Sequence, residues 1–276
     1  MIYQEHIIAY SKNSTIRRES SSGGFCKSFL IYLIENKVVD YTILTRMKDN
    51  TTSPESIITN DRNKILTRTN SIYEYHNQLE ILSEINADKQ YSFIGLPCFV
   101  RFIRNQQLKN NKYKNIYPLI SILCNQAPVP LFKQKILEDN NIDINEVIDI
   151  NYRYGDYPGS IYVMMRNNKN INLGLLKTAW GKYNDPNYCY APPCCLNCEL
   201  YESKFADIVV GDPWLTKYEK DTKGWTKIIV QNADCMNLIR DCAAKNYIYI
   251  EKLDNTILAY KKTKIFKQDN NNKRCK

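Results

Sequence analysis

The sequence predicts an α/β fold with a mixed, largely parallel sheet flanked by helices, and an irregular, cysteine-bearing C-terminal part. Short apolar runs typical of buried strands alternate with helical apolar periods through the first 140 residues, which favours such a fold. The 276 residues are enough to bury a core as one large domain or as two lobes that share a cleft. Prolines and cysteines gather over 184–200, where neither period continues, so an irregular loop is expected there.

The first half of the chain supplies the clearest elements. Phe25, Phe29 and Leu33 recur at four-residue spacing and predict a helix over 24–37. This helix follows an expected strand at 5–10 and precedes another at 38–45, the beginning of an α/β unit. Further strands are expected near 56–59, at 91–95 and at 116–123, and further helices over 74–88, from about 99, and after Pro128 and Pro130.

The second half is less regular. Strands are expected near 147–153, 161–166, 206–211, 228–231 and 247–250, and a helix over 233–245. A soft boundary lies near 140–146, but both halves contribute cysteines, so residues 1–262 are expected to form a single domain. The polar, lysine-rich residues 263–276 are expected to form a disordered tail.

Charge and hydropathy limit which partners and which cellular compartment are expected for this chain. A net charge of +9 favours anionic partners such as phosphates or acidic electron carriers, although scattered lysines equally serve solubility. The basic residues form no clear stripe, so no nucleic-acid partner is expected. Neither a signal peptide nor an apolar run of roughly 20 residues is visible, which predicts a cytoplasmic protein without a membrane span.

Four of the ten cysteines suggest a shared site. In a reducing cytoplasm, clustered cysteines more often bind metal or do redox work than form disulfides. Cys195 and Cys198 form a C-x-x-C pair, while Cys98 and Cys124 each follow an apparent strand. Adjacent parallel strands end at one edge of a sheet, so these thiols are expected to meet there.

The cysteines alone do not distinguish a zinc ion from an iron–sulfur cluster. Four thiolates suit either Zn²⁺ or a [4Fe–4S] cluster. A single buried cysteine after a strand is more often just a small apolar residue. Cys189 and Cys194 lie close to the C-x-x-C pair, so either one is a possible substitute ligand.

A serine- and glycine-rich segment precedes the first long helix. Ser21, Ser22, Gly23 and Gly24 are candidates for binding a phosphate, because backbone N–H groups at a helix start favour anions. Simple capping of the helix by a serine hydroxyl is the commoner role.

Two charged residues join the candidate list. Lys27, one turn into the helix, is a second candidate contact for an anion, although a solvated helix face is the more common place for a lysine. Asp212 follows the 206–211 strand and is expected either to hydrogen-bond a cofactor or to cap the turn before Pro213.

Taken together, four blocks make the chain resemble the coenzyme F420 hydrogenase/dehydrogenase β-subunit family. They are Ser-Ser-Ser-Gly-Gly-Phe at 20–25, Phe-Ile-Gly-Leu-Pro-Cys at 93–98, Ser-Ile-Leu-Cys at 121–124, and Cys-Leu-Asn-Cys at 195–198 followed by Ala-Asp-Ile-Val-Val-Gly-Asp at 206–212. The blocks occur in family order across about 17–214. Leu96 and Phe99 replace the usual threonine and glutamine beside Cys98, so the substrate pocket is expected to differ.

The resemblance implies an iron–sulfur flavoprotein oxidoreductase. Such a protein holds FAD and one [4Fe–4S] cluster, here on Cys98, Cys124, Cys195 and Cys198, and moves electrons to or from an organic substrate or an F420-type deazaflavin. The two-cluster ferredoxin segment that many relatives carry is not seen here, so an external carrier such as ferredoxin is expected. A basic segment with Lys109, Lys112 and Lys114 is a candidate contact for that carrier.

Two other functions remain open. Relatives associated with surface polysaccharides suggest a sugar or polysaccharide-precursor oxidoreductase. A zinc-stabilised nucleic-acid- or protein-binding module without redox activity is the alternative from another class. Zinc sites of that class usually show two close cysteine pairs, whereas this chain has one.

Overall fold

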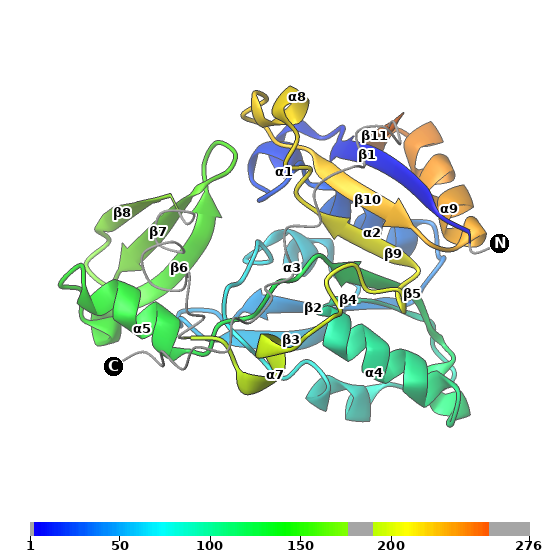
Figure 1. Cartoon of the computed structure of the whole chain (residues 1–276), viewed down its shortest axis with the longest axis horizontal. Coiled ribbons are helices and arrows are strands. Elements are labelled where there is room, and N and C mark those ends of the chain that lie inside the picture. Colours follow the sequence, from blue (N-terminus) through cyan, green and yellow to red (C-terminus); the bar gives the residue numbers. More distant parts are fainter. Residues whose placement is uncertain (1–2, 176–189, 254–276) are drawn as a thin grey trace.

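The computed structural model describes residues 3–175 and 190–253, and in these it contains a large sheet and a small one (Figure 1). The large sheet has eight strands in the order β11-β1-β10-β9-β5-β4-β2-β3. Its strands are β1 (Glu5–Ser11), β2 (Tyr41–Met47), β3 (Pro54–Thr59), β4 (Tyr91–Gly95), β5 (Ile116–Ile122), β9 (Ile208–Gly211), β10 (Thr226–Val230) and β11 (Ile248–Lys252).

The centre of this sheet is parallel and its flanks are antiparallel. Strands β2, β4, β5 and β9 pair in parallel, whereas β3 joins β2 and β10 joins β9 in antiparallel pairs. Strand β1 runs in the same direction as β9, because two antiparallel pairings, through β10, separate them. The carboxyl ends of β1, β2, β4, β5 and β9 therefore meet at one edge, the usual place for ligands in such sheets.

Helices cover both faces of the large sheet. Helices α2 (Phe25–Glu35), α3 (Arg62–Leu66) and α9 (Ala233–Ala244) share one apolar core with it, and α4 (Pro97–Gln107) and the 3₁₀ turn η1 (Glu80–Glu84) share the other. Strand β9 shows why: Ile208 and Val210 pack into the first core and Val209 into the second, as the two-residue period of a strand requires. Shorter elements are α1 (Ser14–Arg18), η2 (Asn111–Tyr113), η3 (Ile144–Glu146), α7 (Pro193–Leu196) and α8 (Thr216–Glu219).

A second, three-stranded sheet stands to one side (Figure 1, left). Strands β6 (Val147–Tyr154), β7 (Ser160–Met165) and β8 (Asn170–Leu175) pair antiparallel, and α5 (Leu131–Glu138) packs on one face through Phe132 and Ile136. We call β6–β8 with α5 the side sheet. It has its own apolar core, which receives Met47 from the end of β2.

The expected fold class is confirmed, with one wrong helix. Residues 74–88 contain only the short turn η1, because the preceding segment is held in tertiary contacts: the Tyr75 N–H donates to the Pro128 carbonyl at 2.6 Å. The sequence also did not indicate α3 or β8. The single domain over 1–262 and its soft boundary near 140–146 stay predictions, and the tail at 263–276 lies outside the described residues.

In the described residues, no helix combines the length and the apolar character needed to cross a bilayer.

Candidate cofactor cavity and cysteine group

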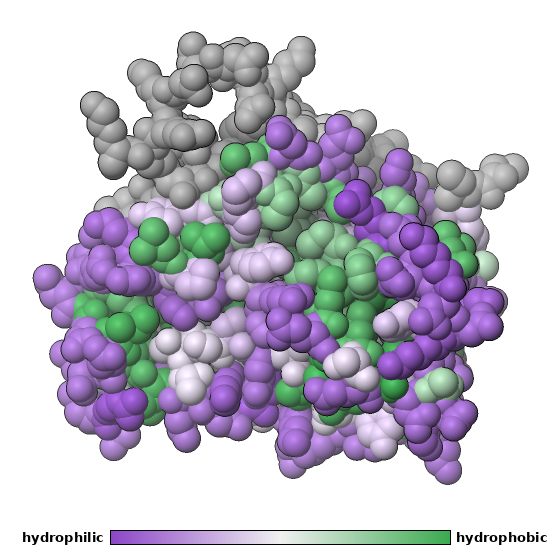
Figure 2. All heavy atoms as spheres, turned by 90° about the horizontal axis from the view of Figure 1, so that it is seen from below, coloured by the Kyte–Doolittle hydropathy of each residue, from purple (hydrophilic) through white to green (hydrophobic). Residues whose placement is uncertain are grey.

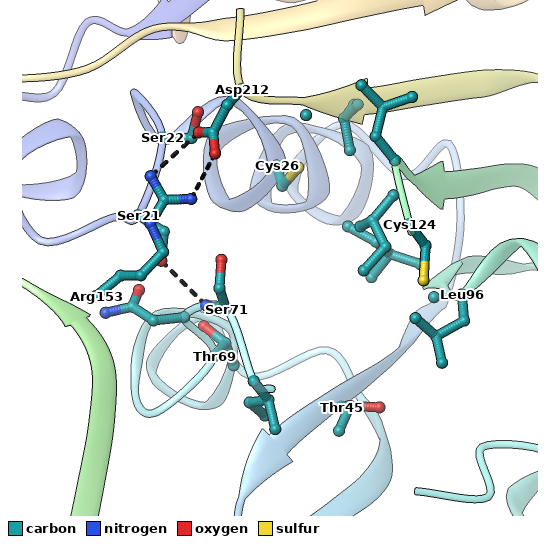
Figure 3. Close-up of a pocket in the computed structure, with 18 of the residues that line it drawn as sticks. Ser21, Ser22, Cys26, Thr45, Thr69, Ser71, Leu96, Cys124, Arg153 and Asp212 are labelled. Carbon is teal, nitrogen blue, oxygen red and sulfur yellow. Dashed lines mark hydrogen bonds and ion pairs between the residues drawn. The ribbon is translucent and has the colours of Figure 1, made fainter. Parts of the chain in front are cut away.

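A cavity of about 610 Å³ opens where the carboxyl ends of the strands meet. Its volume is in the range of sites for small molecules and cofactors, roughly 300–1,000 Å³. The wall combines the start of α2, the ends of β4 and β9, the segment after β5, and the side sheet. Figure 3 shows Ser21, Ser22, Arg153 and Asp212 on one side of the cavity and Cys124 and Leu96 on the other. We call these the polar side and the cysteine side.

The start of α2 lies on the polar side without a side-chain cap. Gly24 is the N-cap residue, with a left-handed φ of +78°, and the described residues provide no side-chain cap bond at this end of the helix. Capping by serine is thus wrong: the Ser22 hydroxyl donates to the Trp225 carbonyl at 2.7 Å, and the Ser21 hydroxyl accepts from the Ser71 N–H at 3.0 Å. Since no side chain caps them, the first amides of α2 remain available to an anion.

Glycine is needed at position 23 for a close backbone contact and not, as expected, for contact with a phosphate. The residue has φ +69°, and a Cβ there would lie 2.8 Å from the Trp225 Cα. It is not among the residues that line the cavity. The prediction that Gly23 contacts a phosphate is therefore not supported: its missing side chain lets the loop at Trp225 approach. Ser21, Ser22 and Gly24 do line the cavity.

Lys27 is buried at the cavity wall rather than solvated. Only 8% of the residue is exposed, so the expectation of a solvated helix face is wrong. Its Nζ donates to the Leu66 carbonyl at 3.1 Å and to Asn70 Oδ1 at 2.9 Å, and both of these acceptors are neutral. Burial lowers the pKa of this ammonium to about 8. Glu19 stabilises the charge from a distance, but a buried cation whose hydrogen-bond partners in the described residues are neutral still favours an anionic ligand.

Asp212 forms an ion pair with Arg153, a residue that was not among the candidates from the sequence. Both its oxygens accept from the Arg153 guanidinium, at 2.8 and 3.1 Å (Figure 3, dashed lines). Arg153 comes from β6 and also donates from Nε to the Pro158 carbonyl at 2.8 Å. The pair ties the side sheet to the end of β9 and presents a guanidinium to the polar side. No local pattern signals a contact between residues 59 positions apart.

The four predicted cysteines come together on the cysteine side. Cys98 lies in the first turn of α4 and Cys124 just after β5, while Cys195 and Cys198 belong to α7 and its end. Burial raises the pKa of the Cys98 thiol to about 11, and Cys198 and Cys195 add to that rise. Burial also raises the pKa of Cys124, with further contributions from Cys195, Cys98 and Cys198. We call these four residues the cysteine group.

Backbone amides support two of these sulfurs. The backbone amides of Phe99 and Ala127 lie near the sulfurs of Cys98 and Cys195, and each opposes the rise in thiol pKa that burial causes. Hydrogen bonds to cysteine sulfur are one way in which proteins tune iron–sulfur centres. Cys194, which is exposed, also interacts with Cys195, so the choice between these neighbours stays open. Cys189 lies outside the described residues.

Across 3–175 and 190–253, no three histidine, cysteine or carboxylate side chains are arranged to hold one metal ion. Four thiolates around one Zn²⁺, each at about 2.3 Å, would lie within about 4 Å of one another. A [4Fe–4S] cluster binds each thiolate to a different iron and separates the sulfurs more widely.

Comparison with known proteins identifies relatives of this chain. A functionally uncharacterized protein of Methanocaldococcus jannaschii is 25% identical over 263 residues, which are 89% of this chain and 90% of that one. The F420-dependent formate dehydrogenase subunit beta of the same organism is 22% identical, and the match covers 90% of this chain and 62% of that subunit. The coenzyme F420 hydrogenase subunit beta of Methanosarcina barkeri is 22% identical, covering 82% and 79%.

A solved structure and two family matches complete the comparison. A chain of the F420-reducing [NiFe] hydrogenase complex from Methanosarcina barkeri superposes with a TM-score of 0.69 at 20% identity, covering 90% of this chain and 81% of that one, which supports the fold. Residues 6–83 match the coenzyme F420 hydrogenase/dehydrogenase, beta subunit N-term, and residues 88–256 match the corresponding C terminus. The resemblance expected from the sequence motifs is thereby confirmed, and the chain belongs to the coenzyme F420 hydrogenase/dehydrogenase β-subunit family.

Proposed function

We propose that this chain is an iron–sulfur flavoprotein oxidoreductase, with a [4Fe–4S] cluster on Cys98, Cys124, Cys195 and Cys198 and FAD in the cavity. Membership of a family of oxidoreductase subunits supports the reaction class. One observation carries the proposal: Cys124 belongs to the cysteine group and also lines the cavity. A group bound in the cavity would therefore lie next to one bound by the cysteines.

The cysteine group fits a cluster by its donor chemistry. Burial, and to a smaller extent the neighbouring thiols, raise the pKa values of Cys98 and Cys124. The positive charge of iron would offset this rise by stabilising the thiolates. A bound cluster exchanges single electrons, and a bound flavin stores two, so the pair couples one-electron carriers to two-electron chemistry. The protein contributes the position and the environment of both groups.

The cavity fits FAD by charge and polarity. The uncapped start of α2 and the buried Lys27 ammonium suit a pyrophosphate on the polar side. The wall also carries apolar side chains that suit a flat aromatic ring, among them Leu44, Ile94, Leu96 and Leu123. Ser21 and Ser22 contribute hydroxyl oxygens whose positions are held by other bonds.

The substrate and the electron carrier follow from the relatives by analogy. Two relatives are named for F420, so an F420-type deazaflavin is the proposed substrate, and a sugar-like metabolite is the alternative within the same reaction class. An external carrier such as ferredoxin would supply or accept single electrons. Lys109 lies beyond the C-terminal end of α4, whereas Cys98 lies in its first turn, and at a rise of about 1.5 Å per residue the helix itself separates the two by more than roughly 13 Å.

A contact nearer to Cys98 is therefore the better candidate for the carrier. Cys98 is exposed, and the exposed apolar side chains Tyr75, Phe102 and Leu196 lie close to the cysteine group in space or sequence. Figure 2 looks onto the lower side of the molecule in Figure 1, the side of α4 and α7, where hydrophobic patches lie between hydrophilic ones. Such a mixed surface suits a transient electron-transfer contact.

The deciding experiment is anaerobic purification followed by absorption spectroscopy and analysis of iron, sulfide and flavin. About four irons and one flavin per chain are expected for one cluster and one FAD. Cys98→Ser and Cys198→Ser should remove most of the iron, whereas Cys235→Ala should retain it, because that cysteine is buried in the core around α9. A colourless protein that contains zinc, or no metal, would overturn the proposal.

A further inference from the structure

We infer that the side-chain amide of Gln126 pairs with the imide edge of a flavin or deazaflavin ring bound in the cavity, and so fixes that ring next to the cysteine group. The imide edge is the N3–H of the ring with its two flanking carbonyls. This inference rests on the proposed function and deepens it, because it assigns a direction to the bound ring.

The first observation is an amide without partners. Gln126 lines the cavity and is 7% exposed, and neither its Oε1 nor its Nε2 has a hydrogen-bond partner in the described residues. A buried donor or acceptor left without a partner costs about 1–3 kcal/mol, and folded proteins keep few of them. A ligand that offers both a donor and an acceptor would remove this cost.

Two other polar side chains that line the cavity, in contrast to Gln126, already have partners. Gln78 donates from Nε2 to Thr45 and accepts at Oε1 from the Leu96 N–H, at 3.1 Å. Asp212 is occupied by Arg153 on the polar side. Gln126 therefore stands out as an amide whose donor and acceptor are both left for a ligand.

The second observation is the position of Gln126. It follows Cys124 by two residues, and the backbone amide of the next residue, Ala127, lies close enough to Cys195 to lower the pKa of that thiol. The segment that carries the amide therefore runs past the cysteine group. Figure 3 shows Cys124 across the cavity from Ser21 and Arg153. Because Gln126 lies two residues from Cys124 and lines the same cavity, a ring held by Gln126 would lie on the cysteine side.

The chemistry of the amide selects the ligand edge. One side-chain amide offers an acceptor and a donor side by side, and it makes two parallel bonds to an edge that presents N–H next to C=O. Flavins and deazaflavins share such an edge, whereas a phosphate or a sugar does not. With the anionic group near Lys27 and the imide edge at Gln126, one ligand would span the cavity from the polar side to the cysteine side.

The test compares lumiflavin with 3-methyllumiflavin, whose N3 carries a methyl group instead of a hydrogen. Both are titrated into the flavin-free full-length protein, with the quenching of flavin fluorescence as the readout. Wild type should bind lumiflavin about tenfold more tightly, a typical discrimination for a paired amide edge. Gln126→Met keeps a similar volume without the amide, so this preference should vanish. The neighbouring Asn125→Ala variant should keep it.

The outcomes separate the inference from the proposed function. If FAD and lumiflavin bind but wild type shows no preference over the methylated ring, the role of Gln126 is overturned and the flavoprotein proposal stands. If neither FAD nor lumiflavin binds, both fail. Should Gln126→Met not fold, the two ligands on wild type still decide.

The same variant tells which ring the amide holds. If the amide holds the ring of FAD, Gln126→Met should lower the affinity for FAD about tenfold. If it holds the ring of the deazaflavin, the same variant should instead lower the affinity for F420. An unchanged affinity for both would overturn the inference.

Discussion

The two sides of the cavity differ in how many of their polar groups are already bonded within the chain. On the polar side, Ser21, Ser22 and the Arg153–Asp212 pair are held by bonds within the chain. On the cysteine side, thiols with raised pKa values lie near in sequence to the Gln126 amide, which has no partner among the described residues. The contrast teaches that bonds within the chain fix the polar side, whereas the cysteine side keeps polar groups that such bonds do not satisfy.

The largest expected effect is a loss of stability when the ion pair on the polar side is removed. Arg153→Met should destabilise the protein by about 3–5 kcal/mol, because it leaves the buried Asp212 carboxylate without its partner. Denaturant unfolding measures the change, and the Arg153→Met/Asp212→Asn double variant should recover part of it. Removing the exposed pair between Arg240 and Glu5 is the control and should cost at most about 1 kcal/mol. Similar losses for both pairs would show that the Arg153–Asp212 contact does not organise the cavity.

The next effect separates the two sides by their ligands. ADP carries the pyrophosphate of FAD without the flavin ring. Lys27→Met should lower the affinities for ADP and FAD alike by roughly 10–150-fold. This range corresponds to the loss of about 1.5–3 kcal/mol from one charged hydrogen bond. Gln126→Met should weaken FAD and leave ADP unchanged. Calorimetry on flavin-free protein measures both, and a Lys27→Met variant with full ADP affinity would place the anion elsewhere.

The smallest effect is a dependence on pH that comes from Lys27. Its pKa falls to about 8 in the folded protein from the ordinary 10.5, so the folded chain holds this proton less tightly than the unfolded chain. The free energy of unfolding, measured relative to Lys27→Met, should therefore rise as the pH increases from about 8 to 10.5. ADP affinity should instead fall over the same range, because the neutral amine attracts the anion less. A flat difference between the two proteins would mean that Lys27 is not desolvated.

Local patterns predicted those features that depend on near neighbours in the chain. Phe25, Phe29 and Leu33 form the buried face of α2, as their spacing indicated. The pairing of β4 with β5 in parallel places the residues after both strands at one edge, as expected for Cys98 and Cys124. The helix expected over 74–88 was wrong because Tyr75 and Gln78 are held by partners far along the chain.

The sequence by itself determined the fold class, the family and the residues of the cysteine group, because periodicity, turn residues and cysteine spacing are written in short segments. Only the tertiary structure decided how those segments meet: that Arg153 occupies Asp212, that Lys27 is buried, and that Gln126 has no partner within 3–175 and 190–253. The physical reason is that burial and hydrogen-bond partners depend on contacts between distant parts of the chain, which no local pattern encodes.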